Sequence, residues 1–98
     1  MSDEQRSYLV AYDINDDTRR AHVAKKLQSH GERLQYSVFL LRIRPAQLLR
    51  LKAALETEID RGADSILICD VGPSRRAKRD LTFIGRRSYE DTIIPTVI

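Results

Sequence analysis

Residues 7–14 read SYLVAYDI, a run of aliphatic and aromatic side chains that contains one acidic residue, Asp13. A run of this length and composition predicts a buried β-strand. Asn15, Asp16 and Asp17 follow it directly and offer side-chain caps and negative charge to the start of a helix. The chain therefore opens with a strand that leads into a helix, and Asp13 lies at their junction.

Apolar stripes at helical spacing alternate with short apolar runs in the rest of the chain. The first helix has Gly31 as its predicted end, because glycine is favoured just after a helix. The second helix is predicted to begin at Pro45, which suits a first turn, and to end at Gly62. Further strands are predicted over residues 33–44, 64–71, 81–84 and 92–98, and Pro95 makes the last of these an edge strand.

Two interpretations of residues 33–44 lead to the same fold class. This apolar stretch is either one long strand or two shorter strands joined by a bend. Strands and helices in this order predict an α+β, ferredoxin-like fold (βαββαβ), which has an antiparallel sheet with two helices on one face. We expect a single domain over residues 1–98, with its core in about residues 1–85 and a C-terminal edge strand in residues 86–98.

The predicted strands are apolar on both faces, whereas two helices cover only one face of a sheet. Leu9 and Ala11 alternate with Tyr8, Val10 and Tyr12, so either set leaves apolar side chains on the second face. An exposed apolar patch on the order of several hundred Å² marks an interaction surface. We therefore expect a homodimer in which the second faces of two copies meet, and in which residues 86–98 pair with the partner.

The composition excludes several classes of protein. Of 98 residues, 42% are hydrophobic and 32% are charged, and no run approaches the roughly 18–20 apolar residues of a membrane span. The start, MSDEQRSYLV, is acidic where a secretory signal is basic and then apolar. Cys69 is the single cysteine, which fits a reducing cytoplasm, and its setting in ILICD predicts a small core residue. We expect a cytoplasmic protein with no membrane span.

The positive charge of the chain is concentrated in its last quarter. Residues 1–71 carry 11 basic and 11 acidic side chains, whereas residues 72–98 carry 6 basic and 3 acidic ones. A local basic run predicts a polyanionic partner such as a nucleic acid, and the alternative is a solvated loop. The basic residues that we expect to contact a nucleic acid here are Arg75, Arg76, Lys78 and Arg79.

Asp13 is the candidate metal ligand, because a carboxylate at the end of a strand is held rigidly. The alternative is a helix cap or a solvated side chain. Mg²⁺ binds through one or two carboxylates with waters and a substrate phosphate. Asp13 from each of two copies would therefore hold one ion over a phosphodiester. Arg19 and Arg20 in the first helix, and Arg33 further on, are candidates to contact the phosphate, with a solvated surface as the alternative.

Two stretches of the sequence resemble a known family. The first contains YDI at residues 12–14, an acidic cap, Arg20 and a helix that ends in Gly31. The second is RLQYSVF at residues 33–39. Together, in this spacing, they resemble the CRISPR-associated Cas2 family over about residues 8–43, and more loosely as far as Gly72.

The resemblance implies a ferredoxin-like homodimer that bridges dimers of the Cas1 integrase during spacer acquisition. It also implies an endonuclease that depends on Mg²⁺, with Mn²⁺ as the alternative ion, and that cuts single-stranded RNA or double-stranded DNA. Asp13 matches the metal ligand of the family, and the other catalytic positions match Arg20, Arg33, Ser37 and Phe39.

The sequence departs from the family pattern at two positions. His22 stands where some members have an arginine, and Leu40 stands where an acidic residue is common. The alternatives to a nuclease are a non-catalytic scaffold that binds nucleic acid and bridges integrase dimers, and a related toxin-like endoribonuclease.

Overall fold

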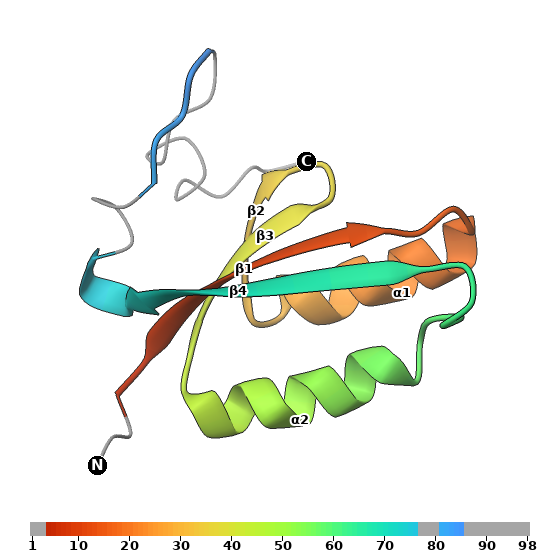
Figure 1. Cartoon of the computed structure of the whole chain (residues 1–98), viewed down its shortest axis with the longest axis horizontal. Coiled ribbons are helices and arrows are strands. Elements are labelled where there is room, and N and C mark those ends of the chain that lie inside the picture. The colour runs from red at the N-terminus through yellow and green to blue at the C-terminus, as the bar shows by residue number, and fades with distance from the viewer. Residues whose placement is uncertain (1–3, 77–80, 86–98) are drawn as a thin grey trace.

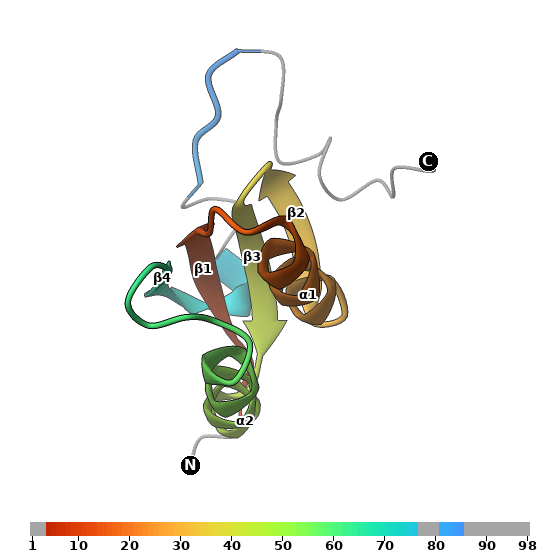
Figure 2. The ribbon, with the colours of Figure 1, turned by 90° about the vertical axis from the view of Figure 1, so that its right-hand side faces the viewer.

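The computed structural model describes residues 4–76 and 81–85. Four strands form one antiparallel sheet in the order β2-β3-β1-β4 (Figure 1). Both helices lie on one face of this sheet (Figure 2), which confirms the predicted ferredoxin-like α+β fold. The elements are β1 (Arg6–Asp13), α1 (Asp17–Gln28), β2 (Gly31–Gln35), β3 (Val38–Ile43), α2 (Pro45–Glu56), β4 (Ser65–Pro73) and the short 3-10 helix η1 (Ser74–Arg76).

The stretch over residues 33–44 is two strands rather than one. Tyr36 and Ser37 form a turn, and the chain then pairs with itself as the β2–β3 hairpin. The pairing shifts register between Arg33 and Gln35, which bends β2 just before the turn. The long apolar run thus supplies both a central strand and an edge strand, and it completes the βαββαβ order.

Both helices end earlier than the glycines predicted. Helix α1 ends at Gln28, and Gly31 is already the first residue of β2. A Cβ at Gly31 would lie 2.2 Å from the backbone oxygen of Leu40, so glycine is needed here for close approach of two strands and not as a helix stop. Helix α2 ends at Glu56, six residues before Gly62, and the residues between form turns.

The main core lies between the sheet and the two helices. Alternate residues of β1 and β3 point into it because successive side chains of a strand face opposite sides. Phe39, Leu41 and Val10 are fully buried there, with Val23 and Leu27 of α1 packed against them. Partly buried side chains close the core at its margin: Leu48, Ile59, Ile66 and Ile68.

A second, smaller cluster occupies the opposite face of the sheet. Leu34 and Leu40 are buried there, and Leu81 and Phe83 from the chain's own later segment pack against the cluster. Residues 81–84 were predicted as a strand, but within the described part they form none and instead cover some of this face. The predicted strand over 92–98 and its pairing with a partner lie outside the described residues.

Around Leu67 and Cys69, the β4 part of this second face carries no such cover from the described residues. Leu67 pairs with Ala11 and is 65% exposed, and Cys69 pairs with Leu9 and is exposed as well. The prediction of Cys69 as a core residue was therefore wrong, because β4 is an edge strand and Cys69 points away from the helices. Among the described residues, no helix is long and apolar enough to cross a membrane.

Candidate nuclease site at the end of the first strand

Three segments meet at one end of the sheet. They are the end of β1 with Asp13, the β1–α1 loop, and the β2–β3 turn (Figure 2). The backbone N–H of Tyr12 donates a hydrogen bond of 3.1 Å to the carbonyl oxygen of Ser37, which fixes the turn beside the strand end. The fold therefore brings Asp13, Ser37 and the arginines of α1 and β2 to the same end of the molecule.

Asp13 is exposed, and its carboxylate has no hydrogen bond or ion pair with any residue in the described part of the chain. The helix cap is Asp16, whose carboxylate accepts a 2.9 Å hydrogen bond from the backbone N–H of Arg19. Asp17 pairs with Arg20, and Asp64 pairs with Arg19. Asp13 thus differs from these neighbouring carboxylates, because its oxygens remain available to a ligand.

Arg19 is committed to an ion pair within the chain. Its Nε and Nη2 donate to the two carboxylate oxygens of Asp64, at 2.6 Å and 3.2 Å. This guanidinium, together with the backbone N–H of Asp60, holds the pKa of Asp64 below its ordinary value. The pair joins the first turn of α1 to the start of β4, so Arg19 has a structural partner where we expected a phosphate.

Arg20 braces the loop that follows Asp13. Its Nη1 donates to the carbonyl oxygens of Ile14 at 2.9 Å and Asn15 at 3.3 Å, and its Nη2 pairs with the carboxylate of Asp17. The hydrogen bond to Asp17 is the main reason that the pKa of Arg20 is raised. Arg20 thus uses both terminal nitrogens of its guanidinium within the chain, one on backbone oxygens and one on the carboxylate of Asp17.

Arg33 differs from both of these arginines, because its guanidinium has no hydrogen bond or ion pair with the residues that the structure describes. Its guanidinium carbon lies 5.0 Å from the ring centroid of Phe39 and 5.9 Å from that of Tyr36. Its Nε is buried without an acceptor. Cation–π contacts hold the side chain in place and leave its charge uncompensated, as a phosphate-binding group requires.

Phe39 and Ser37 have different positions in the site. Phe39 is fully buried and stacks on Tyr12 with a centroid distance of 6.2 Å. It packs against the guanidinium of Arg33, and its burial keeps it out of contact with a substrate. Ser37 is partly exposed in the turn, and its hydroxyl has no hydrogen bond to the described residues. Its hydroxyl is therefore free to serve a ligand.

Arg75, the one member of the predicted basic cluster whose side chain is described, lies at the other end of the sheet. Arg6 at the start of β1 pairs with Pro73, and Arg75 follows in η1 (Figure 1). The eight-residue strand β1 separates this end from Asp13 by roughly 25 Å. Arg75 makes a 2.6 Å ion pair with Glu4. The other members fall outside the description: residues 78 and 79 are not described, and the side chain of Arg76 is not described.

Comparison with known proteins places this geometry in a family. A family model described as CRISPR associated protein Cas2 matches residues 6–79. The chain belongs to the Cas2 family. A relative from Rhodospirillum rubrum, named CRISPR-associated endoribonuclease Cas2 1, is 33% identical over 87% of this chain and 83% of its own. Another from the same organism, named CRISPR-associated endoribonuclease Cas2 3, is 39% identical over 92% of this chain and 98% of its own.

Solved Cas2 structures share the fold. The crystal structure of Streptococcus pyogenes Cas2 at pH 6.5 superposes with a TM-score of 0.73 at 33% identity. The superposition covers 81% of this chain and 99% of that one.

The two departures from the family pattern lie away from the free carboxylate of Asp13. His22 points to the end of α2, where its Nδ1 lies 3.2 Å from a carboxylate oxygen of Glu58. Leu40 is fully buried in the second cluster. An apolar residue at this position of a Cas2 chain therefore contributes to packing, and it supplies no second carboxylate to the site.

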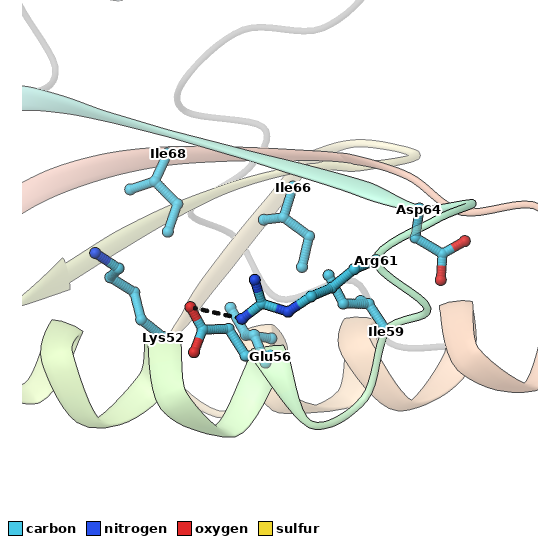
Figure 3. Close-up of a pocket in the computed structure, with 8 residues that line it drawn as sticks. Lys52, Glu56, Ile59, Arg61, Asp64, Ile66 and Ile68 are labelled. Atoms are coloured by element: carbon cyan, nitrogen blue, oxygen red, sulfur yellow. Dashed lines mark ion pairs between the residues drawn. The ribbon is translucent and has the colours of Figure 1, made fainter.

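A groove of about 290 Å³ between α2 and β4 contains none of the predicted site residues (Figure 3). Its floor includes Ile59, Ile66 and Ile68, and an ion pair of 3.5 Å joins Arg61 and Glu56 at its rim. Asp64 also lines it, but this carboxylate is bound to Arg19. Both carboxylates that line the groove are therefore paired, and it offers no free carboxylate of the kind found at Asp13.

The donor atoms at the end of β1 fit a magnesium ion only in part. In the described part of the chain, no three acidic, histidine or cysteine side chains gather into a metal-binding group. The Asp13 carboxylate and the Ser37 hydroxyl are oxygen donors, which Mg²⁺ prefers, and this ion keeps several waters and binds substrate phosphate. A single exposed carboxylate therefore fits Mg²⁺ if a second copy or a substrate completes the site.

Sequence reasoning missed two residues that shape this end of the molecule. Asp64 fixes Arg19, and its position immediately before the apolar run SILIC was a signal comparable to that of Asp13. Tyr36 is 70% exposed in the β2–β3 turn. Only the interpretation of residues 33–44 as two strands joined by a bend allows this exposure.

Proposed function

We propose that this chain is a metal-dependent endonuclease that cleaves RNA phosphodiester bonds at Asp13. The observation that carries the proposal is the presence of two uncommitted groups at one end of the sheet, the exposed carboxylate of Asp13 and the guanidinium of Arg33. The relatives named endoribonucleases support the choice of RNA. Double-stranded DNA is the alternative substrate.

Asp13 would hold Mg²⁺, or Mn²⁺ in its place, together with Asp13 of a second copy. The ion would polarise a phosphoryl oxygen and lower the pKa of a bound water. The proposed homodimer supports this arrangement because the second face of the sheet exposes Leu67 and Cys69 beside β1. Burial of that face against another copy would bring the two strand ends together.

The chain's own residues would position the phosphate. Arg33 places an uncompensated positive charge beside the turn, and its planar fork suits two phosphate oxygens. Ser37 donates its hydroxyl proton in a hydrogen bond to the same group. Arg20 would act indirectly. It holds the backbone of Ile14 and Asn15 and so keeps Asp13 in place.

Family membership supports two further parts of the proposal. The dimer would join the Cas1 integrase in the complex that acquires new spacers, and the protein would work in the cytoplasm, where its single cysteine stays reduced. The basic run at residues 75–79 supports a second candidate function, a scaffold that binds nucleic-acid backbone without cutting it.

The experiment incubates the wild-type protein with single-stranded RNA and with duplex DNA of the same sequence, each with Mg²⁺ or with EDTA. The proposal predicts cleavage of RNA that requires Mg²⁺ and is lost in EDTA. Cleavage that persists in EDTA would overturn the metal mechanism. Tight binding of both substrates without any cleavage would favour the scaffold.

A further inference from the structure

An exposed aromatic ring lies on a well-held turn beside the candidate site. Tyr36 is 70% exposed, although Leu34 in β2, two residues before it, is buried. Two contacts from Tyr12 hold the backbone of the turn. The Tyr12 hydroxyl donates to the carbonyl oxygen of Tyr36 at 3.5 Å, and the Tyr12 N–H donates to that of Ser37 at 3.1 Å. The ring is thus presented to solvent from a fixed position.

One side of the Tyr36 ring is already occupied by a cation. The guanidinium carbon of Arg33 lies over it at 5.9 Å from the centroid, and the same group lies 5.0 Å from the buried ring of Phe39. Arg33 therefore sits between a buried and an exposed aromatic ring. It backs the exposed ring with a positive charge that no carboxylate of the described residues neutralises.

This arrangement lies one strand away from Asp13. The backbone hydrogen bond between Tyr12 and Ser37 places Asp13 and Tyr36 each one residue beyond a paired position. Adjacent strands are about 4.8 Å apart. Asp13 points to the opposite face of the sheet from its neighbour Tyr12. A nucleic-acid strand with one phosphate near Asp13 would therefore cross this end of the sheet and pass the Tyr36 ring.

We infer that Tyr36 is a stacking subsite for an unpaired nucleobase, with Arg33 contacting the adjoining phosphate. The inference rests on the proposed function and deepens it, because it names the residue that contacts the base of the substrate. An aromatic ring stacks on any base whose face is free, whereas both faces of a base inside a duplex are covered by its neighbours. The subsite therefore selects single strands by the availability of a base and not by its sequence.

Binding is measured in EDTA, so that cleavage does not interfere, with a fluorescent single-stranded RNA and a duplex of the same length. We expect Tyr36→Ala to weaken binding of the single strand by about 5- to 150-fold and Tyr36→Phe to retain it. Leu49→Ala removes a side chain that is 67% exposed on α2 and is the matched control, with no effect expected. Binding of the duplex should change less than twofold in all three variants.

A set of RNAs with one abasic nucleotide at successive positions identifies the stacked base. One position should weaken wild-type binding by the same factor as Tyr36→Ala, and the variant should then be insensitive to it. Circular dichroism and sedimentation establish that each variant is folded and has the wild-type oligomeric state. Single-strand binding by Tyr36→Ala within twofold of wild type would overturn the subsite, and so would loss of oligomers in this variant.

The result that would refute the proposed nuclease differs from the result that would refute the stacking subsite. If wild-type protein binds RNA through Tyr36 but never cleaves it with Mg²⁺, the nuclease is wrong and the stacking subsite stands. If RNA is cleaved at Asp13 while Tyr36→Ala is indistinguishable from wild type, the nuclease stands and the subsite is wrong.

Discussion

Asp64 and Arg19 lock two distant parts of the chain together at the end of the sheet that carries Asp13. The ion pair has two hydrogen bonds, at 2.6 Å and 3.2 Å, and the side chain of Asp64 is fully buried beneath it. The next residue, Ser65, pairs with Asp13 across β1 and β4. The Arg19–Asp64 ion pair therefore anchors the start of β4, whose first residue Ser65 lies beside Asp13.

We predict that Asp64→Ala lowers the urea midpoint more than any other aspartate-to-alanine change at this end of the sheet. The variant leaves Arg19 without its carboxylate and the backbone N–H of Asp60 without its acceptor. Glu56→Ala is the matched control, because its 3.5 Å ion pair with Arg61 is exposed on both sides and should contribute little. Equal midpoints for the two variants would contradict a structural role for the buried pair.

The same carboxylate predicts how stability depends on pH. The pKa values of Asp64 and Asp70 are lowered in the fold by their hydrogen bonds to Arg19 and Arg6, from an ordinary value of 3.8. Below pH 3.8 the unfolded chain binds more protons than the folded chain, so the stabilisation present above this pH is lost as the pH falls through the lowered values.

Urea midpoints measured from pH 6 to pH 2 (roughly the range in which carboxylates titrate) test this dependence. The wild type should lose stability steeply on the acid side. A double variant, Asp64→Asn with Asp70→Asn, should start lower and fall less steeply. Parallel curves for the two proteins would show that other groups cause the acid sensitivity.

Salt dependence distinguishes the arginine that is free from the arginine that is paired. Arg33 has no acceptor among the described residues, whereas Arg19 is held by Asp64. Arg33→Ala should reduce the slope of log affinity against log salt for single-stranded RNA by about 0.7, the loss of one phosphate contact. Arg19→Ala should leave the slope unchanged. A reduced slope for Arg19→Ala together with an unchanged slope for Arg33→Ala would contradict a phosphate contact by Arg33.

Gly31 is predicted to be required for the β2–β3 contact. A Cβ at this position would lie 2.2 Å from the Leu40 oxygen and 2.7 Å from a methyl carbon of Leu41. Gly31→Ala should therefore cost about 1–3 kcal/mol of unfolding free energy, measured with urea. Gly62→Ala is the matched control, because its nearest atom is the Asp60 carboxylate at 3.5 Å. A stable Gly31→Ala protein would mean that the strands approach less closely than described.

Local patterns in the sequence were sufficient to predict the fold. The run SYLVAYDI became β1, and the acidic residues after it include the cap of α1. What failed depended on contacts between distant segments. Gly31 was interpreted as a helix stop because the close approach of β3 cannot be seen from neighbouring residues. The turn at Tyr36 was hidden inside an apolar run that suits either one strand or two.

The candidate site could be predicted only in part, again because contacts between distant segments cannot be seen in the sequence. Asp13 stood out because one carboxylate interrupted an apolar strand, and the structure places it exposed at the strand end. The states of the three arginines were not predictable. Arg19 meets Asp64 across 45 positions of sequence, so its pairing depends on the packing of α1 against the start of β4. Arg33 remains uncommitted because its neighbours in space are aromatic rings.

The single-turnover rate of RNA cleavage by Asp13→Asn in Mg²⁺ measures whether the free carboxylate of Asp13 carries the chemistry. The substitution preserves the shape of the side chain and removes its charge. We expect the rate to fall by more than about 100-fold relative to wild type, while RNA binding in EDTA and the urea midpoint stay unchanged. Cleavage by Asp13→Asn at the wild-type rate would show that the carboxylate of Asp13 has no part in the reaction.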